Sequence, residues 1–120
     1  MKKTLVIGVS ARHERFANLA VRNLIAHGHP VEAIGLQKGH CCGIEIKTGK
    51  PKIEDVDTVT LYVGPKNQDM YIDYVLNEIK PKRIIFNPGT ENPAFQNLAE
   101  KQGMEVDEAC TLVLLSRRAY

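Results

Sequence analysis

Residues 4–16 read TLVIGVSARHERF, and they join a short apolar run to the start of a helical pattern. Thr4 to Val9 is rich in β-branched residues, which is typical of a strand buried on both faces of a parallel sheet. From Phe16 to His27 apolar residues recur at helical spacing, and Gly28 follows as a helix terminator. The stretch therefore predicts a strand, a tight loop and a helix, which together form a first βα unit.

The alternation of strand-like and helix-like segments continues to the end of the chain. Further strands are predicted over Val31 to Gly35, Asp57 to Val63, Arg83 to Phe86 and Glu105 to Ala109, and further helices over Asn67 to Lys80, Asn92 to Gly103 and Leu112 to Arg117. The polar segment Leu36 to Asp55 is expected to be a loop with one extended piece at Ile44 to Lys47. This pattern indicates the α/β class, with one Rossmann-like domain over 1–120 and a doubly wound, parallel five-stranded sheet.

Composition and charge exclude several classes of function. Sixteen Lys and Arg stand against fourteen Asp and Glu, so the net charge of +2 gives no field strong enough for nucleic-acid binding. The longest apolar run, Leu112 to Leu115, is too short to span a bilayer, and the residues after Met1 form no secretory leader. We therefore expect a cytoplasmic protein with no nucleic-acid or membrane partner. The sequence does not determine the oligomeric state, and it allows a homo-oligomer.

The loop from Gly8 to Arg15 has the chemistry of a phosphate site. Small residues, among them Ser10 and Ala11, allow a ligand to approach the backbone. The Ser10 hydroxyl and the free N–H groups of the first helical turn can bond phosphate oxygens, and the helix dipole favours the negative charge. Arg12 and Arg15 add positive charge. The loop predicts a nucleotide-type ligand, and a purely structural tight turn is the alternative.

An NAD(P) site is the weaker interpretation of the same loop. The dinucleotide fingerprint Gly-x-Gly-x-x-Gly is incomplete, because Ser10 and His13 occupy the second and third glycine positions. No acidic residue follows the second predicted strand, where Gly35 and Leu36 stand, so the usual partner of a ribose diol is missing. Lys38 would still suit a 2′-phosphate, which keeps NADP open as an alternative.

Several short motifs match one known family. Gly8, Ser10 and Arg15 fit its opening Gly-x-Ser loop with an arginine before the helix, and Gly28-His-Pro-Val31 fits its helix end and second strand. Further matches are Lys38 in Leu36-Gln-Lys-Gly39, Val63-Gly-Pro65, Asn87-Pro-Gly-Thr-Glu-Asn92 and Cys110 after Glu108. The chain thus resembles the small CoA-binding-domain proteins, single-domain relatives of the N-terminal domain of the succinyl-CoA synthetase α subunit. It departs from them at Ala17, where a serine is common, and at Leu36, where a proline is usual.

The resemblance implies that the chain binds coenzyme A or an acyl-CoA. The implied site comprises Gly8, Val9, Ser10, Ala11, Arg12, Arg15 and Phe16 around the phosphates, Leu36 and Lys38 beside the adenosine, and Val63, Gly64, Pro65, Pro88 and Gly89 along the pantetheine arm. In the synthetase the phosphorylated histidine belongs to a second domain, so ligase activity is not implied here.

No catalytic or metal-binding constellation is evident. Cys110 ends an apolar strand, where a free cysteine is more often a packed hydrophobe than a nucleophile or redox thiol. The cluster His40-Cys-Cys42 lacks a second Cys/His pair at zinc spacing, and three cysteines form no disulfide framework. The sequence therefore favours a binding protein without catalysis of its own. A Cys110-dependent or NAD(P)-dependent enzyme and a ligand-free interaction module remain the alternatives.

Overall fold

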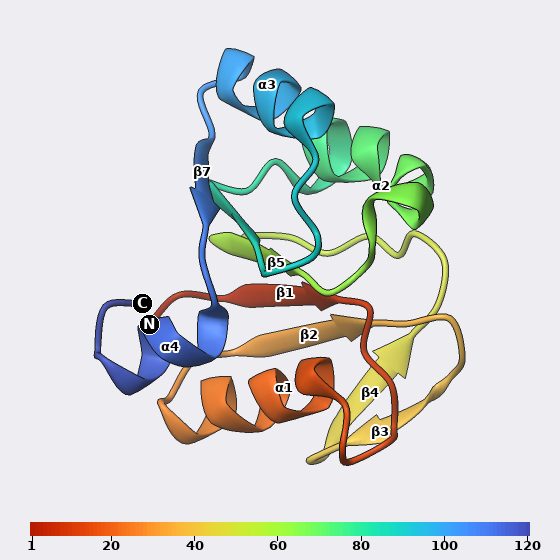
Figure 1. Ribbon diagram of the computed structural model, residues 1–120. Helices are drawn as coiled ribbons and strands as arrows, with labels where there is room; N and C mark the ends of the chain where they lie inside the picture. The colour runs from red at the N-terminus through yellow and green to blue at the C-terminus, as the bar shows by residue number, and fades with distance from the viewer.

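A seven-stranded sheet with strand order β3-β4-β2-β1-β5-β6-β7 runs through the computed structural model of residues 1–120 (Figure 1). The strands are β1 (Thr4–Ile7), β2 (Val31–Ile34), β3 (Gly39–Cys41), β4 (Ile44–Lys47), β5 (Thr58–Leu61), β6 (Arg83–Phe86) and β7 (Glu105–Glu108). Neighbouring strands are parallel throughout, except that β3 is antiparallel to β4. Every residue of β1, β5 and β6 is buried, as expected of strands covered on both faces.

Helices cover both faces of the sheet. The helices α1 (Phe16–Ala26) and α4 (Thr111–Ser116) lie on one face and contact each other (Figure 1). The other face carries the 3₁₀ turn η1 (Pro65–Asn67), the helix α2 (Asp69–Asp73), its π-helical continuation η2 (Tyr74–Ile79) and the helix α3 (Pro93–Lys101). None of these helices combines the length and the apolar character that crossing a membrane requires.

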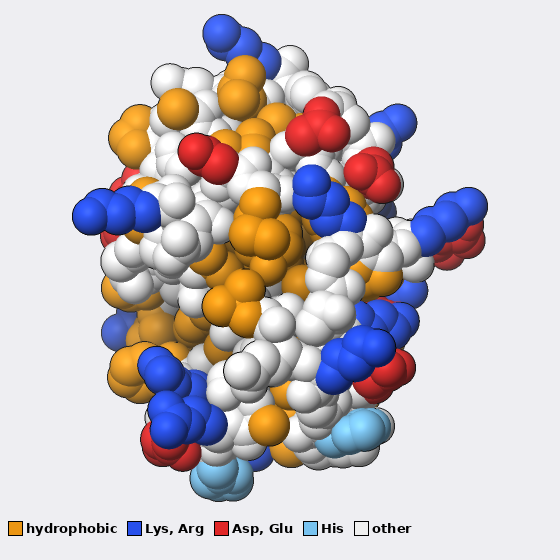
Figure 2. Space-filling view, turned by 90° about the vertical axis from the view of Figure 1, so that its right-hand side faces the viewer, with side chains coloured by type: hydrophobic (Ala, Val, Ile, Leu, Met, Phe, Trp, Pro, Cys, Tyr) orange, Lys and Arg blue, Asp and Glu red, His pale blue; other side chains and the backbone are white.

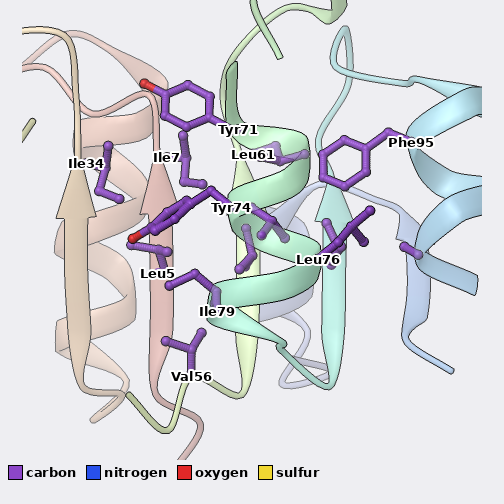
Figure 3. Packing of buried hydrophobic residues seen from close by; sticks show 14 of the residues in the cluster. Leu5, Ile7, Ile34, Val56, Leu61, Tyr71, Tyr74, Leu76, Ile79 and Phe95 are labelled. Atoms are coloured by element: carbon purple, nitrogen blue, oxygen red, sulfur yellow. The ribbon is translucent and has the colours of Figure 1, made fainter. Parts of the chain in front are cut away.

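Two hydrophobic cores result, one on each face. The larger contains Leu5 and Ile7 of β1, which lie beside Tyr74 of η2, and it extends past Leu61 of β5 to Phe95 of α3 (Figure 3). The smaller joins the opposite face of the sheet to α1 and α4, and its members include Val6, Val21, Leu24 and Leu115. Alternate residues of β1 therefore belong to different cores, which is the period-two geometry of a buried strand.

The predicted doubly wound α/β class is confirmed, but the predicted number of strands is wrong. The segment Leu36 to Asp55 holds the antiparallel hairpin β3–β4, so the expectation of a loop with a single extended piece missed β3. The hairpin turns at Cys42 and Gly43, whose φ angles of 55° and 79° are those of a two-residue primed turn.

Helix boundaries follow local signals closely. Asn92 caps α3 by accepting a hydrogen bond from the Phe95 N–H at 3.2 Å, and Pro93 occupies the first helical position, as predicted. The helix predicted over Asn67 to Lys80 is instead divided into η1, α2 and η2. Lys80 ends it in the left-handed region with a φ of 50°, immediately before Pro81.

The chain leaves β1 toward β2 on one side and enters β5 on the other. This reversal of direction makes the gap between the carboxyl ends of β1 and β5 the topological switch point. Ligands of doubly wound folds bind outside the sheet at such a point.

Candidate functional site

A cavity of about 1200 Å³ opens at the carboxyl ends of the parallel strands. Figure 2 shows the face toward which β1 and β2 point, with hydrophobic side chains in a central hollow and Lys and Arg side chains around it. Among the residues expected at the site, the lining includes Gly8, Val9, Ser10, Ala11, Arg12, Arg15, Phe16, Leu36, Lys38, Val63, Gly64, Pro88 and Gly89. Pro65 is the expected residue that does not line the cavity. The fold thus gathers segments from four separate loops around one hollow.

The lining also contains residues absent from the predicted set. They are Glu14, Ala17, Gln37, Tyr62, Asn67, Met70, Tyr71 and Thr90. Several of them lie next to predicted residues in the same loops. Their proximity in sequence to those residues was the signal that could have identified them as lining residues. Met70 and Tyr71 belong to α2, where an apolar stripe indicates burial but does not indicate which side chains reach past the core.

Gly8 sets the path of the loop between β1 and α1. Its φ angle is +103°, a left-handed conformation that side-chain-bearing residues rarely adopt, and a Cβ atom would lie 2.7 Å from the carbonyl oxygen of Tyr62. The N–H groups of Gly8 and Val9 both donate to the carbonyl oxygen of Ile34, at 2.8 and 2.9 Å. The loop therefore turns across the end of β2 as soon as it leaves β1.

Two side chains of α1 hold this loop in place. The amide of Asn18, which is buried, donates to the carbonyl oxygen of Ser10 at 2.8 Å. Its Oδ1 accepts from Nε of Arg22 at 3.0 Å, and Nη2 of Arg22 donates to the carbonyl oxygen of His13 at 2.7 Å. The helix thus fixes two points of the loop that leads into it.

The N-terminus of α1 presents hydrogen-bond donors to the cavity. Arg15 is the N-cap residue, and no side chain caps the helix or places a carboxylate in its first turn. The N–H groups of Phe16 and Ala17 have no intrahelical partner, and both residues line the cavity. Ser10 Oγ accepts from the Arg12 N–H at 3.1 Å, so its own hydroxyl proton is available to an incoming oxygen. This end of α1 is suited to an anion.

Charge is confined to one wall of the cavity. Arg12, Arg15 and Lys38 stand on the side formed by the β1–α1 loop and the segment after β2, together with Glu14. Arg12 Nε lies 3.9 Å from Glu14 Oε1, but both side chains are about 70 % exposed (67 % and 72 %), so this ion pair contributes little. The opposite wall is uncharged, and it contains Val63, Gly64, Asn67, Met70, Tyr71, Pro88, Gly89 and Thr90.

Three large apolar side chains line the cavity while remaining open to solvent. Phe16 is 72 % exposed, Leu36 83 % and Met70 47 %. They come from α1, the segment after β2 and α2, so they surround the cavity from three elements. Such a cluster is available to cover the apolar parts of a ligand.

Gln68 sets the spacing of the loops after β5 and β6. The side chain is fully buried, and its Nε2 donates to the carbonyl oxygens of Val63 at 2.8 Å and Thr90 at 2.7 Å. Its Oε1 accepts from Nδ2 of Asn92 at 3.0 Å. Both loops contribute to the uncharged wall, so this one amide determines the shape of that wall.

Cys110 lies outside the lining of the cavity, at the N-cap of α4. The first helical N–H, that of Thr111, is directed to Oδ1 of Asn87 at 2.9 Å rather than to the thiol. The fold also brings together no group of three His, Cys, Asp or Glu side chains able to share an ion. Cys41 and Cys42 are neighbours at 3.7 Å between sulfur atoms, and burial raises the pKa of the Cys41 thiol to about 11.

Solved structures share this architecture. A crystal structure described as that of an uncharacterized protein is 45 % identical, covers 100 % of this chain and 98 % of its own, and superposes with a TM-score of 0.96. A hypothetical protein from Pyrococcus horikoshii OT3 is 24 % identical, with coverage of 97 % and 82 % and a TM-score of 0.86. A Thermus thermophilus protein is 20 % identical, with coverage of 99 % and 90 % and a TM-score of 0.85. The last two show likeness of fold.

Sequence comparison is more specific. A comparison with curated proteins finds no match. The family model for the CoA binding domain matches residues 2–116, which is nearly the whole chain. The match includes the β1–α1 loop, the uncapped start of α1 and every other segment that lines the cavity. This chain belongs to the CoA-binding-domain family.

Proposed function

We propose that the protein binds coenzyme A or an acyl-CoA in this cavity, without a chemical step of its own. The observation that carries the proposal is the donor-rich start of α1 at the charged wall of the cavity. A pyrophosphate and a 3′-phosphate require oriented N–H groups together with scattered cations, and both requirements are met there. Ser10 and the first turn of α1 would hold the pyrophosphate, and Arg12, Arg15 and Lys38 would neutralise its charge.

The uncharged wall supports the assignment of the remainder of the ligand. Pantetheine is a long, flexible arm without charge, and Val63, Gly64, Pro88 and Gly89 offer backbone and apolar surface along that wall. The adenosine would lie beside Leu36 and Lys38. The charged wall and the uncharged wall thus correspond to the two chemically different ends of coenzyme A.

A dinucleotide is a weaker match to the same cavity. NAD sites place a carboxylate at the end of the second strand to bind the ribose diol. Here β2 is followed by Gly35, Leu36 and Gln37, and the carboxylate that lines the cavity, Glu14, comes from the β1–α1 loop instead. This difference in donor set favours coenzyme A.

Thermal unfolding with and without ligand tests the proposal. A ligand that binds only the folded protein stabilises it by about 2.7 kcal/mol at a concentration of a hundred times its Kd. Coenzyme A and acetyl-CoA should raise Tm, whereas NAD, NADPH and ATP should raise it less or not at all. A larger shift with NADPH, or no shift with any of them, would overturn the proposal.

Charge reversal tests the placement of the phosphates. Arg15→Glu and Lys38→Glu should each weaken the binding of coenzyme A, because they replace a favourable charge by a repulsive one at the charged wall. Lys50→Glu, at an exposed position outside the cavity, is the matched control for the change in net charge. Unchanged affinity for coenzyme A in both cavity variants would contradict the placement of the phosphates at this wall.

A further inference from the structure

The hydroxyl group of Tyr71 makes no hydrogen bond within the protein and is not sealed from solvent, although the residue as a whole is only 2 % exposed. The ring belongs to the larger core, and Figure 3 shows it beside Ile7 at the carboxyl end of β1. Tyr71 also lines the cavity. A buried tyrosine usually finds a protein partner for its hydroxyl, so a hydroxyl left without one at a cavity wall is available to a ligand.

The other tyrosines show what is unusual about this one. Tyr74 donates to the carbonyl oxygen of Pro51 at 2.5 Å, and the hydroxyl of Tyr120 lies 2.5 Å from Oγ1 of Thr4. The hydroxyl of Tyr62 is enclosed and unpartnered. That of Tyr71 is unpartnered but not enclosed, so the small accessible surface of this residue includes its polar atom. Among the four, only Tyr71 offers an unused hydroxyl to the cavity.

The hydroxyl is a donor under ordinary conditions. Burial raises the pKa of Tyr71 above its usual value, so the phenol stays protonated at neutral pH. The preferred partner of a protonated phenol with a free O–H is an acceptor oxygen.

The surroundings of Tyr71 select the kind of acceptor. The neighbouring residues on its wall, such as Val63, Asn67 and Met70, carry no charge, and the cations of the cavity stand on the other wall. A phosphate would be drawn to the cations, whereas a carbonyl oxygen of an uncharged chain can be buried beside an apolar wall if one good donor meets it. Tyr71 supplies that donor.

We propose that the Tyr71 hydroxyl donates a hydrogen bond to an amide carbonyl oxygen of the pantetheine arm. Tyr71 then distinguishes coenzyme A from nucleotides that share its phosphates but lack the arm. The inference rests on the proposed function, because it assigns a contact within the same bound ligand.

Calorimetric titration of Tyr71→Phe with two ligands tests the assignment. Coenzyme A contains the arm, and adenosine 3′,5′-bisphosphate lacks it. Removal of the hydroxyl should raise the Kd of coenzyme A about 3- to 10-fold, as expected for the loss of one hydrogen bond, and should leave the Kd of the bisphosphate unchanged. The ring is retained, so the larger core stays filled and Tm should hardly change.

Tyr74→Phe is the matched control, because it removes a tyrosine hydroxyl that bonds Pro51 outside the cavity. It should lower Tm and leave both Kd values unchanged. Equal Kd values for coenzyme A in Tyr71→Phe and the unaltered protein would overturn the inference alone. An equal loss of affinity for coenzyme A and for the bisphosphate would also overturn the inference, because it would indicate that the hydroxyl contacts the phosphates. Failure of the unaltered protein to bind coenzyme A would overturn the proposed function as well.

Discussion

The carbonyl oxygen of Val9 lies against Gly35 so closely that a Cβ atom at Gly35 would stand 2.0 Å from it. Gly35 does not adopt a left-handed conformation, so the contact, rather than the backbone angle, requires glycine here. The contact lets the loop after β1 cross the end of β2, where Gly8 and Val9 both donate to Ile34. The residue that follows β2 therefore helps to support the loop between β1 and α1.

Gly35→Ala should destabilise the protein by about 3 kcal/mol or more, because the added methyl group meets backbone that cannot rotate away. Urea unfolding measures the change. Gly64→Ala is the control, since a methyl group added there would meet no heavy atom within 4 Å and the φ of −63° suits alanine. Its effect should stay within about 0.5 kcal/mol. A Gly35→Ala variant as stable as the unaltered protein would contradict the close contact.

Asn18→Ala should lower both stability and ligand affinity. The change leaves the Ser10 carbonyl oxygen and Nε of Arg22 without their partner, at a cost of about 1–3 kcal/mol in stability. The loop then loses one of its two attachments to α1, so its donors are less well oriented for an anion. Thermal unfolding and titration with coenzyme A measure the two effects. Asn23→Ala on the same helix should change neither by much, because the side-chain bonds from α1 to the loop come from Asn18 and Arg22.

Gln68→Leu should destabilise the protein by about 3 kcal/mol, although leucine fills a similar volume. The carbonyl oxygens of Val63 and Thr90 would both lose their donor, the first in a partly buried and the second in a buried position. Because the two loops would separate, amide hydrogen exchange should accelerate in both of them while the central strands stay protected. Gln102→Ala, at an exposed position after α3, provides the comparison. Unchanged exchange in the loops would show that Gln68 does not hold them together.

Local patterns explain why most of the fold could be predicted. The apolar run at Thr4 to Ile7 and the cap at Asn92 are complete within a few residues, and the structure places a strand and a helix start there. The hairpin β3–β4 lies at the edge of the sheet, where only Cys41 and Ile46 are buried. The missed strand β3 is only three residues long and shows no apolar alternation, and the Cys42-Gly43 turn is not one of the strong hairpin dipeptides.

The same distinction between local and non-local features applies to the residues of the candidate site. Loop residues such as Ser10 and Lys38 could be predicted, because parallel strands place their following loops at one edge of the sheet. Gln68 and Tyr71 could not, since a helical apolar stripe does not reveal which polar atom bridges two loops or remains unpartnered. The contact of Val9 with Gly35 joins residues of two different strand ends, and no local pattern records it.

Cys41 and Cys42 should react with a thiol-alkylating reagent at very different rates. Burial, followed by the neighbouring Cys42 thiol, raises the pKa of Cys41 from 9.0 to about 11, whereas Cys42 is exposed at the hairpin turn. The thiolate is the reacting form, so a pKa raised by about two units leaves roughly a hundredfold less of it at pH 8. Peptide mass spectrometry should find Cys42 alkylated first, and the Cys41 rate should rise about tenfold per pH unit until pH approaches 11. Equal rates for the two cysteines in the folded protein would contradict the burial of the Cys41 side chain against α1.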